Sequence, residues 1–141
     1  MHIGSQKDFI EILEVERASD GLPNAGNVRV CVQVTLGEFN GKYESVWLQE
    51  PCLRDFVLEL ATVEKTRKGC VTLKSASPDE FCLTISSLGA LGHFAAEVSL
   101  TRYRYIGDTL WPATVSGNFE IDPTPLPCLL EEFRSLHGSN D

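Results

Sequence analysis

The clearest pattern in the chain is an alternation of apolar and polar residues between Asn27 and Phe39. A period of two is typical of a β-strand that is buried on one face. Asn40-Gly41 follows directly, and this pair is the strongest short signal for a hairpin turn. The residues that share the apolar face are Val28, Val30, Val32, Val34 and Leu36.

A two-residue loop at Asn40-Gly41 predicts the register of this hairpin. Phe39 would pair with Lys42, and Val34 would lie opposite Trp47. The second strand then divides its apolar side chains between the two faces of the sheet. Tyr43 and Trp47 join the valine face, whereas Val46 and Leu48 lie on the other face.

Two further segments have apolar residues three and four positions apart, the spacing of an amphipathic helix. Pro51 suits the first turn of the first helix and Gly69 its stop, and Thr124-Pro125 opens the second helix. Each helix has one apolar face, so we expect each to lie on a sheet. The apolar stripes are Leu53, Phe56, Val57, Leu60 and Val63 in the first helix, and Leu126, Leu129, Leu130, Phe133 and Leu136 in the second.

The remaining apolar segments predict strands that are connected mostly by hairpins. With the first hairpin they give about seven strands, and hence a mostly antiparallel, curved sheet. One helix inserted midway and one at the end make the fold class α+β. The 141 residues fit a single domain, 1–141, with residues 137–141 expected to fray. The additional strands are Phe9 to Arg17, Cys70 to Lys74, Phe81 to Ser86, His93 to Ile106 and Leu110 to Ile121.

Gly107-Asp108 predicts the turn of a second hairpin. A two-residue loop there places Ile106 opposite Thr109 and Arg104 opposite Trp111. We expect the Arg104 guanidinium to lie over the Trp111 ring in a cation–π pair. Pro112 cannot donate to a neighbouring strand, so this end of the hairpin should be a sheet edge or an overhang.

The tip of this hairpin is the candidate contact surface of the chain. Tyr103, Arg104, Tyr105 and Trp111 are of the residue types that are enriched at protein interfaces. The alternative is structural: the aromatic rings would cap the end of the core and the arginines would extend past it.

The chain is acidic, with a formal net charge of −8 and a pI of about 4.8. This balance argues against nucleic acid as a partner, because phosphate contacts need Lys or Arg. It is compatible with a basic protein partner, or with solubility alone. The sequence shows neither a membrane-spanning apolar run nor a signal-peptide pattern, so we expect a cytoplasmic protein without a membrane partner.

Motifs for catalysis or cofactor binding are missing from the sequence: there is no G-x-S-x-G, Walker A, G-x-G-x-x-G or H-E-x-x-H. His93 is the one plausible catalytic imidazole, and a surface position is the better expectation for it, since His2 and His137 lie in termini expected to be mobile. The five cysteines form no C-x-x-C pair and should be buried free thiols. We therefore expect no catalytic residue, no metal and no cofactor.

The run NVRVCVQVTLGEFNGKYESVWLQEPCLRDFVLELATV resembles the N-terminal half of the WapI-like immunity proteins of bacteria. Those proteins have a valine-rich strand, a strand after a glycine turn, and a helix with an L-x-x-F-x-x-x-L pattern, here Leu53, Phe56 and Leu60. The ending NFEIDPTPLPCLLEEFRSL resembles their last strand and helix. The resemblance implies a protein that neutralises a cognate toxin by occluding it.

On this hypothesis the toxin would contact the hairpin tip, and the acidic side chains Glu38 and Glu44 near the other predicted turn would take part. Two alternatives remain open. One is an enzyme or small-ligand binder with a polar pocket around His93 or Cys82. The other is a structural homodimer that pairs along a sheet edge.

Overall fold

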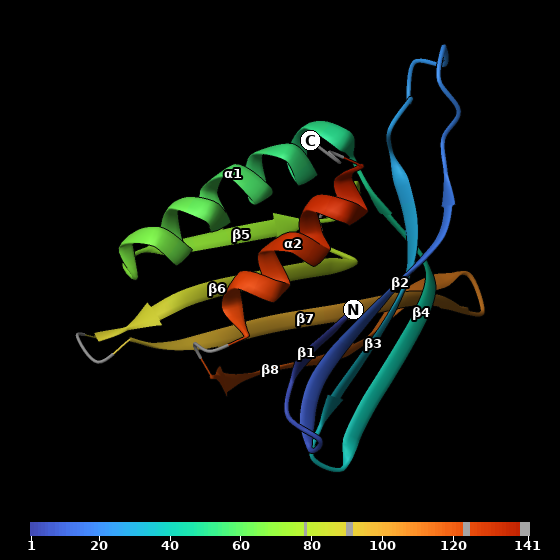
Figure 1. The fold of residues 1–141 in the computed structure, drawn as a ribbon. Helices are drawn as coiled ribbons and strands as arrows, with labels where there is room; N and C mark the ends of the chain where they lie inside the picture. Colours follow the sequence, from blue (N-terminus) through green and yellow to red (C-terminus); the bar gives the residue numbers. More distant parts are fainter. Residues whose placement is uncertain (78, 90–91, 123–124, 139–141) are drawn as a thin grey trace.

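A computed structural model describes residues 1–77, 79–89, 92–122 and 125–138 of the chain (Figure 1). The described residues form eight strands and two helices. In chain order they are β1 (His2–Gly4), β2 (Asp8–Arg17), β3 (Val28–Leu36), β4 (Phe39–Leu48), α1 (Glu50–Thr66), β5 (Cys70–Lys74), β6 (Phe81–Leu88), β7 (His93–Ile106), β8 (Thr109–Ile121) and α2 (Leu126–His137).

The predicted α+β class is confirmed, and every described strand pair is antiparallel. The strands divide between two four-stranded sheets, β1-β2-β3-β4 and β5-β6-β7-β8, where the sequence suggested one curved sheet. The additional strand is β1. Three residues are too few to show an alternation in the sequence, although Ile3 is buried between its neighbours.

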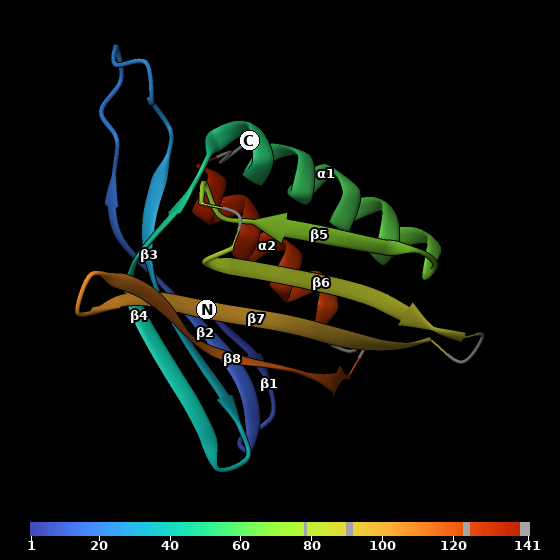
Figure 2. The same cartoon turned by 180° about the vertical axis from the view of Figure 1, so that it is seen from behind.

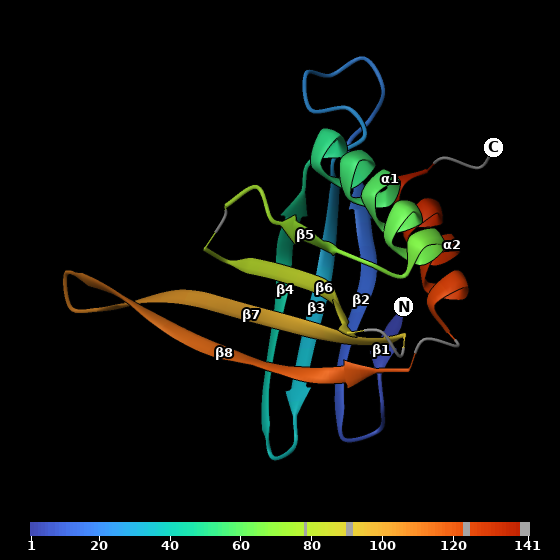
Figure 3. The same ribbon diagram turned by 90° about the vertical axis from the view of Figure 1, so that its left-hand side faces the viewer.

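The two sheets pack face to face with their strands crossing, and both helices lie on the same side of sheet β5–β8 (Figures 1 and 3). The valine face of sheet β1–β4, the inner face of sheet β5–β8 and the helix stripes form one core cluster. Neither of the two described helices covers the other face of sheet β5–β8, here called the uncovered face (Figure 2).

Two glycines lie where strands of the two sheets cross. A Cβ atom on Gly41 in β4 would lie 2.9 Å from Cγ2 of Val115 in β8. A Cβ atom on Gly117 in β8 would lie 2.8 Å from Cδ1 of Leu36 in β3. Gly41 is required because the branched side chain of Val115 has little freedom to move, whereas the flexible end of Leu36 could shift away from a Cβ atom on residue 117.

The predicted turn at Asn40-Gly41 is wrong. Both residues lie within β4, and the turn is Gly37-Glu38, so that Leu36 pairs with Phe39. Gly37 has a φ of +64°, and a type II′ hairpin turn needs a glycine at this first central position. The predicted pairs Phe39 with Lys42 and Val34 with Trp47 are consequently wrong as well.

A β-bulge opposite Cys31 decides the faces of β4. It shifts the register between the pairs Val30–Val46 and Val32–Tyr43. Val46 and Leu48 thereby join the valine face and are fully buried. Tyr43 packs partly against the core as predicted, whereas Trp47 lies on the opposite face, contrary to prediction. Burial of two aliphatic side chains outweighs the local preference of Asn-Gly for a turn.

Both predicted helix stripes are confirmed as buried. The first helix ends earlier than Gly69, since Arg67 adopts a left-handed conformation and its N–H donates to the carbonyl of Val63. The second helix includes His137 and is capped by Gly138. Thr124 and residues 139–141 lie outside the described part of the chain.

Candidate functional site

The β7–β8 hairpin extends beyond the rest of its sheet. β6 pairs with β7 only as far as Leu100, while the β7–β8 pairing continues to Ile106 and Thr109. Residues 102–113, here called the ribbon, are therefore a two-stranded projection, seen at the left of Figure 3. All of them are exposed. The predicted turn at Gly107-Asp108 and every predicted pair of this hairpin are confirmed.

The ribbon has two faces of different chemistry. Tyr103 pairs with Pro112 and Tyr105 with Leu110, so these four side chains form an apolar face. That face continues the uncovered side of the sheet. The opposite face carries Arg102, Arg104, Ile106, Trp111 and Ala113.

The exposure of the three ribbon aromatics argues against the structural alternative, in which the rings cap the end of the core. The exposed fraction is 74% for Tyr105, 52% for Trp111 and 41% for Tyr103. Side chains this open contribute little to the core, since hydrophobic stabilisation scales with the area removed from water. They remain available for contact with another molecule.

Arg102 links the ribbon to the other sheet. Its guanidinium carbon lies 5.6 Å from the ring centroid of Tyr43 in β4, within cation–π range. This contact replaces the predicted one: Arg104 and Trp111 are opposite in register, but among the described residues the cation–π contact is made by Arg102 on Tyr43.

A groove of about 450 Å³ lies where the ribbon meets β4. Glu44 is one of its lining residues, and its carboxylate pairs with Nζ of Lys42 at 3.6 Å. Its backbone carbonyl accepts a hydrogen bond of 3.1 Å from Arg29. The groove is lined by Arg29, Lys42, Tyr43, Glu44, Ser45 and Arg102.

The structure therefore joins only part of the predicted site. Tyr103, Arg104, Tyr105 and Trp111 lie together on the ribbon, and Glu44 lies in the groove beside it. Glu38 lies in the β3–β4 turn, at the lower end of sheet β1–β4 in Figure 3, away from the ribbon tip.

Sequence reasoning missed Tyr43 and Arg102 as neighbours. The pairing of β7 with β8 was available from the turn at Gly107-Asp108. The crossing of the two sheets brings β4 next to the ribbon, and the sequence of neither hairpin alone indicates this crossing.

His93 occupies the surface position expected of it. Its Nδ1 lies 2.7 Å from a carboxylate oxygen of Glu120, and both side chains are at least half exposed. The other two histidines lie in regular elements near the two ends of the chain. His2 is in β1, stacked on Phe9 with ring centroids 4.9 Å apart. His137 Nε2 lies 3.0 Å from Oε1 of Glu50 and connects the two helices.

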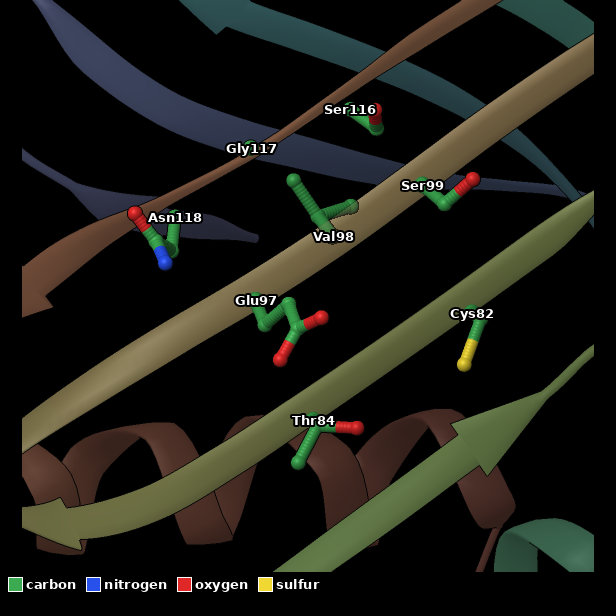
Figure 4. A pocket seen from close by; sticks show the side chains of 8 residues that line it. All are labelled: Cys82, Thr84, Glu97, Val98, Ser99, Ser116, Gly117 and Asn118. Carbon is green, nitrogen blue, oxygen red and sulfur yellow. The ribbon is translucent and has the colours of Figure 1, made fainter.

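Cys82 lines one side of a shallow depression on the uncovered face of sheet β5–β8 (Figure 4). Its volume of about 210 Å³ is below the range of typical small-ligand pockets. Glu97 is its one carboxylate, and His93 is not part of it. The lining residues are Cys82, Thr84, Glu97, Val98, Ser99, Ser116, Gly117 and Asn118.

Burial raises the pKa of the Glu80 carboxyl above 4.5. The described residues contain no group of three or more His, Cys, Asp or Glu side chains placed to hold a metal ion. All five cysteines are free thiols, but Cys52, Cys70 and Cys128 are exposed and Cys31 and Cys82 half-buried, so the predicted burial is wrong.

Comparisons with protein-family models, with curated proteins and with solved structures found no match to this chain. Neither of the helices that the structure describes is long and apolar enough to cross a membrane.

Proposed function

We propose that the chain is a non-enzymatic immunity protein that binds a cognate bacterial toxin and occludes it. The observation that carries the proposal is the ribbon, a projection that presents several large apolar side chains and two arginines to solvent. A small soluble domain gains nothing in stability from holding these groups in water, so a contact surface is the better explanation.

The residues of the ribbon suit the centre of a protein interface. Tyr and Trp supply large contact areas with few rotatable bonds, and Arg adds hydrogen bonds to carbonyl or carboxylate groups. Tyr105 and Trp111 are the most exposed of the ribbon aromatics and are therefore the proposed anchors. A narrow projection can also enter a concave active site, which is how occlusion would work.

Charge supports the same proposal. The chain carries a net charge of −8, and a basic toxin would be attracted to it over a Debye length of about 8 Å at physiological salt. The five free thiols fit the cytoplasm, where disulfides are rare and where a toxin made in the same cell would have to be neutralised.

The test is titration calorimetry against the toxin domain encoded beside the gene of this chain. The expected result is a 1:1 complex. Tyr105→Ala and Trp111→Ala should each weaken it by roughly 30-fold or more, the effect of losing an interface anchor of about 2 kcal/mol. Melting temperatures should not change, because both side chains are exposed.

Leu58→Ala is the matched control, since Leu58 is 63% exposed on α1, outside the ribbon. It should bind the toxin as tightly as the unaltered chain. The proposal fails if no toxin binds, or if the two ribbon variants bind normally.

A further inference from the structure

The strand β8 leaves one edge of its sheet open. In the order β5-β6-β7-β8 it is the last strand, and β7 is its partner in the described ladders. An open edge presents unpaired backbone N–H and C=O groups, which another strand can bind. Native proteins often block such an edge with charged side chains, but residues 114–118 of β8 carry none.

A backbone hydrogen bond of Thr101 shows which backbone N–H and C=O groups of β8 face the open edge. The N–H of Thr101 donates to the carbonyl of Glu80 at 2.8 Å, so the main chain of Thr101 is directed away from β8. Thr101 and its partner Thr114 therefore form a pair without backbone bonds between them. It follows that Thr114, Ser116 and Asn118 direct their N–H and C=O groups away from β7, toward the open edge.

Two features limit the usable length of this edge. Pro112 belongs to the same outward-facing series and has no N–H to donate. At the other end the next residue of this series is Glu120, and a charged side chain on an edge strand opposes the addition of another strand. The open stretch is thus residues 114–118.

A depression lies on each face of the sheet beside this stretch, and Ser116 lines both. On the outer face it is the polar depression that Cys82 lines on one side (Figure 4). On the inner face a second depression of about 250 Å³ is lined by Leu36, Phe39, Thr114, Val115 and Ser116. Phe39 is 73% exposed there. When a strand is added to a sheet, pockets on the two faces receive its alternate side chains.

We propose that the β8 edge at residues 114–118 binds an extended strand of the partner protein. The partner strand alternates apolar residues, which pack on Leu36, Phe39 and Val115, with small polar residues, which face Ser116, Asn118 and Glu97. This inference rests on the proposed function and names the backbone conformation and side-chain pattern of the partner segment.

A strand from a different protein fits this edge better than a second copy of β8. The ends of β3 and β4 project past β8 in Figure 3. If two copies of the chain paired symmetrically through their β8 edges, their β5–β8 sheets would form one continuous sheet. Both β1–β4 sheets would then lie on the same side of that continuous sheet. Each would then project into the space of the other. A single added strand meets only the projecting ends of β3 and β4.

The experiment uses the intact chain labelled for NMR and a capped seven-residue peptide that alternates valine and threonine between terminal lysines. Without peptide, the amides of Thr114, Ser116 and Asn118 should exchange with deuterium quickly, while those of Val115 and Gly117, bonded to β7, exchange slowly. Saturating peptide should slow the three outward amides by about tenfold or more. Ser116→Pro should weaken peptide binding about tenfold through loss of one backbone hydrogen bond, and Ser116→Thr should not.

A peptide of the same sequence with N-methylated backbone amides is the second control, and it keeps the test decisive if Ser116→Pro does not fold. Three results overturn the inference: no slowing by the peptide, equal binding of the N-methylated peptide, or protection of the outward amides that grows with the concentration of the chain alone. The toxin complex separates the two proposals. If the toxin binds without protecting these amides, the strand site is wrong and the immunity function stands. If only the peptide binds, the strand site stands and the immunity function is wrong.

Discussion

Arg102 shows how a residue's role depends on an element far away in the sequence. The register of β7 and β8 correctly places Arg104 opposite Trp111, yet the guanidinium that lies on a ring is that of Arg102, over Tyr43. Tyr43 belongs to the other sheet, so no pattern within residues 93–121 could indicate the contact. Trp111 consequently stays free to contact a partner.

Glu80 gives a pH dependence whose sign follows from its environment. Burial raises the pKa of this carboxyl above 4.5, so the folded state holds the proton to a higher pH than the unfolded state does. The protonated Glu80 carboxyl therefore makes its full contribution to stability below about pH 4.5. This contribution is lost as the pH rises through the pKa of Glu80 in the folded state. Glu80→Gln should raise the melting temperature at pH 7 relative to the unaltered chain, and this gain should vanish at pH 3.

The measurement is the difference in melting temperature between the two proteins from pH 3 to pH 8. Glu97→Gln controls for the loss of one negative charge, because Glu97 is exposed on the neighbouring strand β7. A difference that is constant over the whole pH range would show that burial of Glu80 has no effect on folding.

At the scale of the elements, Gly41 explains why the first hairpin was predicted in the wrong register. Asn-Gly normally indicates a turn, but here the glycine lets β8 cross β4. The glycine that makes the turn is Gly37, and the residue after it is Glu38 and not a typical turn residue such as Asn, Asp or Ser. A single sequence cannot distinguish these two uses of glycine, because one is local and the other depends on a strand some 70 residues away.

Gly41→Ala should therefore destabilise the protein. Its Cβ would lie 2.9 Å from Cγ2 of Val115, whose branched side chain has little freedom to move. Overpacking costs about 1–3 kcal/mol, and the lower entropy of the unfolded chain offsets about 0.4–1 kcal/mol of this. We expect a net loss of about 1 kcal/mol in the free energy of unfolding, measured by urea denaturation.

Val115→Ala provides the matched background for this substitution. With the clashing methyl group removed, Gly41→Ala should become neutral or slightly stabilising, a reversal of sign that a double-mutant cycle detects. An equal loss in both backgrounds would mean that the crossing of β4 and β8 is not the reason for glycine at this position.

The elements that were predicted correctly carry their signal locally. Both helix stripes and all pairs of the β7–β8 hairpin follow from spacing and from one turn. The ribbon was found for the same reason, as a run of aromatic and basic residues across a Gly-Asp turn. β1 and the groove were missed, since a three-residue strand has no periodicity and the groove exists only where two sheets cross.

At the scale of the whole molecule, the two sheets and the helices depend on one core. Sheet β1–β4 is tied to the helices at several points: Asn27 Oδ1 accepts the N–H of Glu50 at 2.9 Å, and Arg17 Nη2 donates to the carbonyl of Leu136 at 2.6 Å. The helices meet each other through Phe56 and Phe133, with ring centroids 4.7 Å apart. Neither sheet has a hydrophobic core of its own, so neither should persist when the other unfolds.

Unfolding should accordingly be a single transition, and the two tryptophans allow this to be tested. Trp111→Phe leaves Trp47, half-buried on β4, as the one tryptophan, so its fluorescence reports on the surroundings of β4. Far-ultraviolet circular dichroism reports on α1 and α2, which pack on the other sheet. The urea midpoints from the two signals should coincide. A separate, earlier loss of Trp47 fluorescence would instead show that sheet β1–β4 unfolds as an independent unit, and the ribbon would then lose Tyr43, its contact on β4, before the rest of the fold is lost.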